Sequence, residues 1–186
     1  MSAATSGWDL RIVPLVLERD ATTLHAWVTH PRSVYWEMQD ASLDDVVAEY
    51  AEIAASEHHE AFLGLADGHP QFLVERYDAR HSPLADLPEI REGDLGMHVL
   101  VAPTDDPQHG FTRAVMRFVM QFCLADPAVR RVVVDPDVRN DAIATLNEAA
   151  GFRVLREVEL PTKTAALSVA TRESFRDSDL ESETDS

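Results

Sequence analysis

Residues 93–124 read "GDLGMHVLVAPTDDPQHGFTRAVMRFVMQFCL", and this stretch decides the fold. Over residues 95–102 the side chains alternate between two faces around His98, which predicts a strand. Gly110 then opens a segment whose apolar residues recur at helical spacing, which predicts a long helix over residues 110–126. The remaining elements are interpreted around this succession of a strand, a glycine-containing turn and a long helix.

The composition is that of a globular protein. The chain has 186 residues, 45% of them hydrophobic, and no apolar run long enough to span a bilayer. A formal net charge of −17 argues against nucleic acid and anionic membranes as partners, because both attract basic surfaces. The single cysteine, Cys123, excludes an internal disulfide and is expected in the core. The opening residues show no export signal, so we expect a cytoplasmic protein.

One domain is expected over residues 1–175, because neither an internal repeat nor a linker interrupts the pattern. Residues 176–186 carry five acids and one base, with Leu180 as their one large apolar residue. Such a composition predicts an acidic, disordered tail.

Local signals place the other elements. Asp20 is expected to cap a first helix, and Ser42 with Asp45 forms a capping-box-like pair at the start of a second. Asn140 opens a later helix that Gly151 closes. The sequence "DGHP" at residues 67–70 predicts a hairpin turn between two strands. The order predicts an α/β protein with a mixed, mainly antiparallel sheet flanked by helices. Strands are expected over residues 8–17, 60–66, 69–78, 95–102, 129–135, 152–161 and 163–171, and helices over residues 20–30, 42–56, 110–126 and 141–150.

Four motifs carry a resemblance to a known family: "GDLGMHVLVAP", "DPAVRRVVVDPDVRN", "LNEAAGF" and "REVELPTKTAAL". The element order resembles the GCN5-related N-acetyltransferase fold, and the motifs resemble its siderophore hydroxamate acyltransferases. Residues 24–50, together with "HEAFLG", most closely resemble the desferrioxamine-type members, which acylate N-hydroxycadaverine. The resemblance covers about residues 9–175.

The resemblance implies an enzyme that moves an acyl group from acetyl-CoA or succinyl-CoA to the hydroxylated nitrogen of a small diamine, forming a hydroxamate. An amine monooxygenase would act before it and a siderophore ligase after it. Acylation of N-hydroxylysine or another amine is an alternative, and a non-catalytic CoA-binding module is another. No metal site is expected, because the adjacent His58 and His59 would point apart.

His98 is the first catalytic candidate. A lone histidine in an apolar strand is more often a core residue, but the resemblance implies catalysis by His98 and Asp137. His98 would accept the proton of the nitrogen or orient it, and Asp137 would fix the tautomer or bind the substrate. Asp135 is the alternative partner of His98.

Acyl-CoA would bind along the strand and the turn that follows it. The strand backbone suits the pantetheine amides, and the helix start suits the pyrophosphate. The turn departs from the wider family, because Pro107 stands at a basic position and Thr112 replaces a second glycine. Asn147 takes the place of a tyrosine that protonates the leaving thiolate elsewhere in the fold. The expected cofactor-binding residues are Val99, Leu100, Val101, His109, Gly110, Phe111, Thr112, Arg113, Ala114, Asn140 and Asn147.

The substrate side requires cover for an alkyl chain and an acid for a distal ammonium group. Aromatic side chains can cover the alkyl chain, and a carboxylate can bind the ammonium group. Lys163 could hold an anionic acyl group such as succinyl, or it could be structural. The expected substrate-binding residues are Tyr35, Trp36, Glu75 and Lys163, with Glu37 and Asp40 as alternatives to Glu75.

Overall fold

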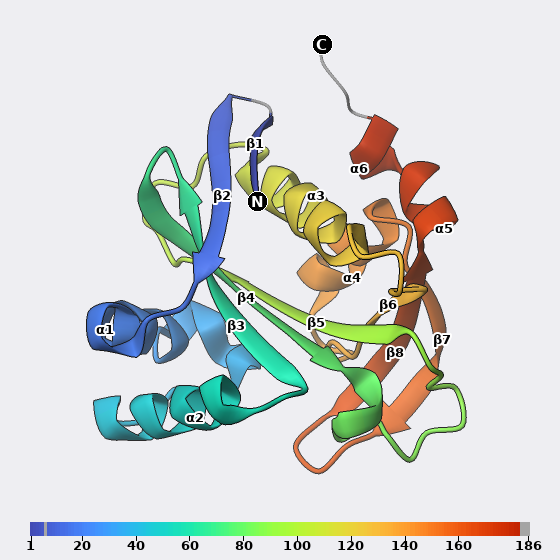
Figure 1. The fold of residues 1–186 in the computed structure, drawn as a ribbon, viewed down its shortest axis with the longest axis horizontal. Helices are drawn as coiled ribbons and strands as arrows, with labels where there is room; N and C mark the ends of the chain where they lie inside the picture. Colours follow the sequence, from blue (N-terminus) through green and yellow to red (C-terminus); the bar gives the residue numbers. More distant parts are fainter. Residues whose placement is uncertain (6, 183–186) are drawn as a thin grey trace. The chain divides into compact units, whose positions relative to one another are not determined.

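The computed structural model describes residues 1–5 and 7–182 (Figure 1). These residues form two compact units. The first comprises Met1–Glu75 and Val99–Phe111, and the second comprises Arg76–His98 and the chain from Thr112 onward. The expectation of one domain over residues 1–175 stays a prediction.

The strands form a mixed, mainly antiparallel sheet, as the sequence predicts. Their hydrogen-bonding order is β1-β2-β3-β4-β5-β6-β8-β7. β5 and β6 pair in parallel, whereas β1–β2, β2–β3, β6–β8 and β7–β8 pair antiparallel. β1 is an addition to the predicted elements. The strands are β1 (Ser2–Thr5), β2 (Trp8–Pro14), β3 (His59–Ala66), β4 (His69–Asp78), β5 (Asp94–Val101), β6 (Arg131–Val134), β7 (Arg153–Glu159) and β8 (Thr164–Thr171).

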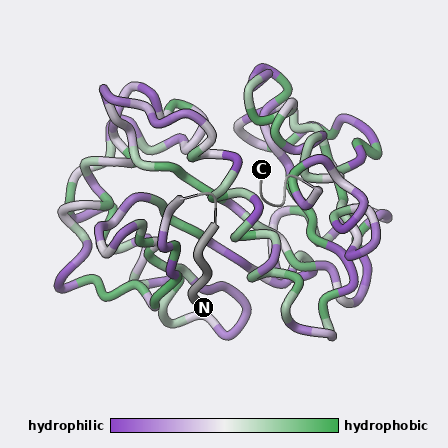
Figure 2. Tube along the Cα trace, turned by 90° about the horizontal axis from the view of Figure 1, so that it is seen from above, coloured by the Kyte–Doolittle hydropathy of each residue, from purple (hydrophilic) through white to green (hydrophobic). Residues whose placement is uncertain are grey.

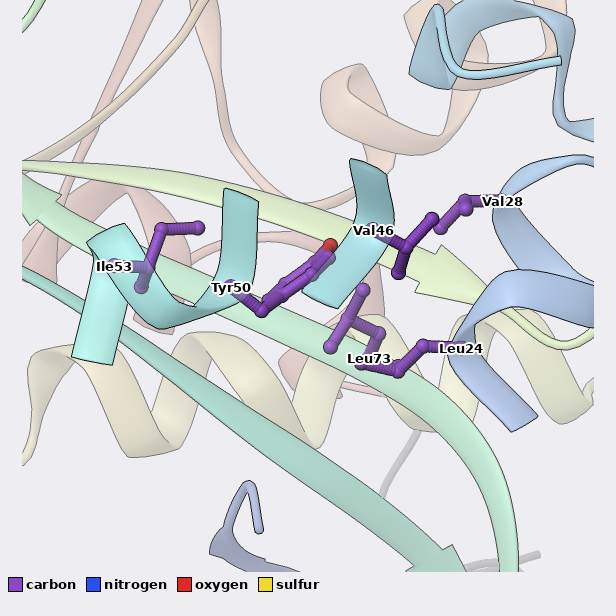
Figure 3. Close-up of a cluster of buried hydrophobic side chains, with 6 residues drawn as sticks. All are labelled: Leu24, Val28, Val46, Tyr50, Ile53 and Leu73. Atoms are coloured by element: carbon purple, nitrogen blue, oxygen red, sulfur yellow. The ribbon is translucent and has the colours of Figure 1, made fainter. Parts of the chain in front are cut away.

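The first unit is built around a cluster of buried apolar side chains. Two helices, α1 (Leu17–Val28) and α2 (Leu43–Ala55), lie side by side in it (Figure 1). The 3₁₀ helix η1 (Pro31–Trp36) connects them. Figure 3 shows six of the cluster's side chains converging from α1, α2 and β4: Leu24, Val28, Val46, Tyr50, Ile53 and Leu73.

The helix caps predicted at Ser42 and Asn140 and the predicted hairpin turn are present in the structure. The Ser42 hydroxyl accepts a hydrogen bond from the Asp45 backbone N–H, and the Asp45 carboxylate accepts one in return from the Ser42 backbone. Asp67 and Gly68 both have positive φ in the turn between β3 and β4, as a tight hairpin turn requires. Asn140 caps α4 (Asp141–Ala149) through the Ile143 N–H, and Gly151 follows it with φ of 81°.

The start of α1 differs from the prediction. The helix begins at Leu17, so the predicted strand over residues 8–17 ends at Pro14 and Asp20 lies inside the first turn. Asp20 still serves the helix end, because its carboxylate accepts a hydrogen bond of 2.9 Å from the Val16 backbone N–H. The carboxylate therefore satisfies a donor before the helix rather than inside it.

The second unit contains α3 (Phe111–Leu124) from Thr112 onward, together with further buried residues. The predicted apolar face is confirmed at Val115, Phe118 and Val119, which are all fully buried. Cys123 is also fully buried, and burial raises the pKa of its thiol to about 12. It is therefore a core residue and remains a thiol at neutral pH. A separate cluster comprises Leu84, Val133, Val158, Ala165, Leu167 and Val169.

The expected disordered tail differs from the structure over residues 176–182. Two short helices follow β8, namely α5 (Arg172–Arg176) and α6 (Asp179–Ser182). Leu180 is 1% exposed, and Glu181 lies 3.3 Å from Arg117 on α3. One buried leucine and a paired acid therefore order a segment whose composition alone indicates disorder. Residues 183–186 of the predicted tail lie outside the described residues.

Hydrophobic and hydrophilic residues alternate in short stretches along the trace (Figure 2). None of the helices within residues 1–5 and 7–182 combines the length and the apolarity that crossing a bilayer requires.

Candidate active site

His98 lies near the middle of β5 with its imidazole accessible, since 40% of its side chain is exposed. Its Nε2 is 3.2 Å from the hydroxyl of Tyr77 on β4 and 3.7 Å from Oδ1 of Asp135. The rings of Tyr77 and His98 are tilted, with centroids 5.1 Å apart. A core histidine would be enclosed, so this exposure favours the functional interpretation of His98.

Asp135 is the carboxylate that contacts His98. It follows β6 directly and is 8% exposed. Tyr77 donates a hydrogen bond of 3.4 Å to its Oδ1, and Lys163 Nζ lies 3.1 Å from its Oδ2. Burial works to raise the pKa of Asp135, but contact with His98 and Lys163 outweighs it and leaves the pKa below its ordinary value. The carboxylate is therefore ionised at neutral pH.

Asp137, which we expected beside His98, binds another side chain. It accepts hydrogen bonds from the Arg139 backbone N–H at 2.8 Å and from the Arg139 guanidinium at 2.5–3.1 Å. This contact lowers the pKa of Asp137 to about 2. Asp135, the alternative, is thus the partner that the structure gives to His98.

Strand register explains the choice between the two acids. β5 and β6 are parallel and pair Asp94 with Arg131 and Gly96 with Val133. Continuing the same offset along both strands brings His98 opposite Asp135. Asp137 lies two residues farther on, roughly 6–7 Å along an extended chain. The sequence contained this signal, but it becomes usable only once the parallel pairing of these two strands is known.

Tyr77 is a member of this cluster that the sequence analysis missed, and a glycine makes room for it. A Cβ atom added at Gly96 would lie 2.0 Å from Cε2 of the Tyr77 ring. Because no side chain larger than hydrogen fits there, the ring can cross β5 beside Gly96. The four groups Tyr77, His98, Asp135 and Lys163 are hereafter called the His98 cluster, and all belong to the second unit.

The strand and turn expected to hold acyl-CoA have suitable local geometry. The register of β5 with β6 ends at Gly96, and β5 continues through Val99, Leu100 and Val101. Gly110 has φ of 82°, and a Cβ atom there would meet nothing within 4 Å. The backbone at the turn is thus open to a ligand.

The helical residues expected to hold acyl-CoA differ in whether their side chains are available to a ligand. Thr112, Arg113 and Ala114 form the first turn of α3, where Ala114 is buried and can offer only its backbone. The Asn140 side chain is engaged in capping α4. His109 and Phe111 flank Gly110, and the Phe111 ring packs edge-on against Trp8 with centroids 5.2 Å apart.

Asn147 on α4 is a buried polar group suited to a ligand. It is 5% exposed, and its Oδ1 has no hydrogen-bond partner within residues 1–5 and 7–182. An unsatisfied buried acceptor is costly, so a ligand N–H would be well matched to it. The residues present therefore fit an amide-rich ligand such as the pantetheine arm of CoA.

The expected substrate residues lie in the first unit, apart from Lys163. Glu75 on β4 is 6% exposed, and its Oε1 accepts a hydrogen bond of 2.8 Å from Tyr50. His59 Nε2 lies 3.5 Å from its Oε2. Burial and the nearby Glu75 raise the pKa of Tyr50, so the phenol stays protonated and donates. Tyr50 was not expected at the site, and His59 was considered from the sequence only as a possible metal ligand.

The remaining candidates around Glu75 differ in exposure. Trp36 packs against the cluster of Figure 3, whereas Tyr35 is exposed. Glu37 has a left-handed backbone with φ of 62° directly after η1. Asp40 is exposed. Glu75 is thus the buried acid among the three candidates for an ammonium partner.

Comparisons with known proteins agree with this architecture. Residues 16–160 match the family model described as "Acetyltransferase (GNAT) domain". An N(6)-hydroxylysine O-acetyltransferase of Escherichia coli is 26% identical over 157 residues, which are 84% of this chain and 50% of that protein. An N-hydroxyputrescine acetyltransferase of Acinetobacter baumannii is 25% identical over 162 residues, 87% of this chain and 77% of that protein.

The fold likeness extends to solved structures. A crystal structure of an aminoglycoside acetyltransferase in complex with coenzyme A superposes with a TM-score of 0.80 at 24% identity, covering 90% of this chain and 98% of that one. This chain spans half the length of the E. coli relative. Because the family model covers most of the chain, including the whole stretch from β5 to α4, the chain belongs to the GNAT acetyltransferase family.

Proposed function

We propose that this protein transfers an acyl group from acetyl-CoA or succinyl-CoA to the hydroxylated nitrogen of N-hydroxycadaverine, as in desferrioxamine-type siderophore assembly. Membership of the GNAT family and relatives named for N-hydroxylated amines support the proposal. The observation that carries it is the His98 cluster, which holds an accessible imidazole against a buried, ionised carboxylate. Such an arrangement is typical of an oriented general base.

The cluster defines one chemical step. His98 accepts the proton that the nitrogen loses as the new C–N bond forms and the C–S bond of the thioester breaks. The resulting imidazolium is stabilised by Asp135, and the departing thiolate takes up a proton. Asn147 lies at the position where a tyrosine acts as the acid in other members of the fold, and an amide cannot donate an ionisable proton. Protonation of the thiolate is therefore left to water or to the imidazolium.

A hydroxylated amine suits this limited acid–base equipment. A hydroxylamine nitrogen is much less basic than an alkylamine nitrogen and is largely neutral near pH 7. It attacks without first losing a proton to the enzyme, so one base acting during bond formation is enough. An alkylamine would need a stronger base to produce the same nucleophile.

The distal ammonium group of the diamine is assigned to Glu75. This acid is buried, and Tyr50 holds one of its oxygens, so its position is well defined. Trp36, on η1, would cover the methylene chain, with Tyr35 at the exposed side. Lys163 is engaged with Asp135 at 3.1 Å, which favours a structural role over binding of a succinyl carboxylate.

A substrate panel tests the proposal. Purified protein is assayed with each acyl-CoA against N-hydroxycadaverine, cadaverine, N-hydroxylysine and an aminoglycoside such as kanamycin. We expect the highest kcat/KM with N-hydroxycadaverine. Turnover of cadaverine that equals or exceeds it would refute the hydroxamate assignment, and a preference for N-hydroxylysine would move the protein to the alternative substrate.

Two histidine variants, one in the His98 cluster and one outside it, test whether the protein is an enzyme or a CoA-binding module. His98→Ala should lower kcat by about 10²-fold or more, the usual contribution of a general base, while CoA affinity is retained. His69→Ala, which removes an exposed histidine at the start of β4, is the matched control and should leave turnover unchanged. A wild-type protein that binds CoA but acylates no amine would favour the binding module.

The chemistry also implies its neighbours. An N-hydroxylated diamine must be supplied by an amine monooxygenase. The hydroxamate product keeps a free amine and, when the acyl group is succinyl, a free carboxylate, and a siderophore ligase would join these two groups. Acyl-CoA and these intermediates are cytoplasmic metabolites, so we place the reaction in the cytoplasm.

A further inference from the structure

We propose that Tyr77 is a positioning residue of the acyl-transfer site, because its hydroxyl joins His98 to Asp135 and thereby fixes the tautomer of the histidine. The inference rests on the proposed function for its role in turnover. The arrangement of the three side chains is independent of that function, and one of the experiments below tests it without any substrate.

The distances favour a path through the phenol. Oη of Tyr77 is 3.2 Å from His98 Nε2 and 3.4 Å from Asp135 Oδ1, both within hydrogen-bond reach. The direct separation between His98 Nε2 and Asp135 Oδ1 is 3.7 Å, which is too long for a hydrogen bond. Asp135 therefore attracts a protonated His98 directly, as an ion pair, whereas its hydrogen-bonded link to the neutral imidazole runs through the tyrosine hydroxyl.

Counting protons assigns the tautomer. An ionised carboxylate only accepts hydrogen bonds, and a tyrosine hydroxyl has one proton to donate. Both contacts of Tyr77 are satisfied together when its proton goes to Asp135 and it accepts the Nε2–H of His98. Neutral His98 then carries its basic lone pair on Nδ1, the nitrogen that would receive the substrate proton.

Each member of this chain of contacts is itself held in place. Lys163 Nζ occupies the other carboxylate oxygen of Asp135 at 3.1 Å, which keeps the acid ionised and oriented. The Tyr77 ring is 6% exposed and crosses β5 where Gly96 leaves space. Because Asp135 and Tyr77 are fixed in this way, they can hold neutral His98 in one tautomer.

Nuclear magnetic resonance of the imidazole nitrogens tests the arrangement in the free protein. With ¹⁵N-labelled histidine, wild-type His98 should show the Nε2–H tautomer as the dominant neutral form. Tyr77→Phe keeps the ring and removes only the hydroxyl, so the Nδ1–H form should become populated. Ser42→Ala, which removes a hydroxyl from the start of α2, should leave the His98 signals unchanged. Identical His98 signals in wild type and Tyr77→Phe would overturn the proposal.

The titration of His98 supplies a second readout. The charged or titratable groups around it include Tyr77 from β4, Asp135 after β6, and Lys163 before β8, with the Asp137–Arg139 pair two residues beyond Asp135. Tyr77→Phe leaves all these charges in place. A changed His98 titration would therefore be attributable to the lost hydrogen bond, and an unchanged titration would count against the proposal.

Kinetics then tests the role in turnover. Loss of tautomer control should lower kcat of Tyr77→Phe by between about tenfold and about 10⁴-fold, with KM for acyl-CoA unchanged. A tautomer shift in a protein that acylates no amine would refute the proposed function and leave the arrangement standing. A full kcat in a variant with a shifted tautomer would refute the positioning role alone.

Discussion

Replacing Gly96 with alanine should displace Tyr77 and disable the His98 cluster. The new Cβ atom would lie 2.0 Å from Cε2 and 2.3 Å from Cζ of the ring. Carbon atoms prefer separations of about 3.5–4.0 Å, so the ring edge must retreat by about 1.5 Å. A movement of this size breaks the 3.2 Å contact between the phenol and His98.

The expected cost follows from overpacking. Forcing a methyl group into a filled site typically costs about 1–3 kcal/mol, and in a protein of this size each kcal/mol lowers Tm by about 2–4 °C. Thermal unfolding should therefore show a loss of roughly 2–12 °C for Gly96→Ala. Steady-state kinetics should show a fall in kcat similar to that of Tyr77→Phe.

Gly64 provides a matched control. A Cβ atom there would lie 2.2 Å from the Phe72 ring, so Gly64→Ala introduces a comparable clash in the first unit. It should lower Tm similarly while the His98 tautomer stays as in wild type. The reasoning would be refuted if Gly96→Ala kept both the wild-type Tm and the wild-type His98 signals, or if Gly64→Ala altered those signals equally.

Three further outcomes are expected. Ser42→Ala should cost about 0.5–2 kcal/mol in urea unfolding through loss of the capping box with Asp45, and Ser42→Thr should recover most of it. Glu75→Gln should raise KM for N-hydroxycadaverine by roughly 10- to 100-fold without changing KM for acyl-CoA, because the amide keeps its size but loses the charge; an unchanged amine KM would exclude Glu75 as the ammonium partner. The lowered pKa of Asp137 means that its ionised form stabilises the fold above the unfolded pKa near 3.9, and that this contribution disappears as pH falls toward about 2. Arg139→Ala should therefore flatten the dependence of unfolding free energy on pH between about 4 and 2, and an identical dependence would contradict this.

Sequence reasoning succeeded where a structural decision is local. The Ser42–Asp45 capping box, the Asp67–Gly68 turn and the Asn140 cap each depend on residues within four positions of one another. Their hydrogen bonds can be anticipated without knowledge of the fold. The order of strands and longer helices from β2 to β8 followed for the same reason, since hydrophobic periodicity is also a local property, whereas β1, α5 and α6 were not predicted.

The partner of His98 could not be chosen in this way. Asp135 and Asp137 are two residues apart, and both follow a buried strand. Which of them meets His98 depends on the register of two strands whose paired residues, such as Asp94 and Arg131, are 37 positions apart in the sequence. Tyr77 comes from a third strand, and its place depends on the missing side chain at Gly96. Such contacts are properties of the assembled sheet, which periodicity does not encode.

The short helix α6 has a consequence for proteolysis. Arg176, a potential trypsin site, is the last residue of α5 and lies three residues before α6. Leu180 is buried, and Glu181 hydrogen-bonds to Arg117 and Gln121 on α3. A protease needs an unfolded segment on both sides of the bond it cuts, so cleavage after Arg176 must await detachment of α6. The rate of tryptic cleavage there would thus report how often this helix leaves α3, and a chain shortened at residue 175 would expose the surface of α3 that α6 now covers.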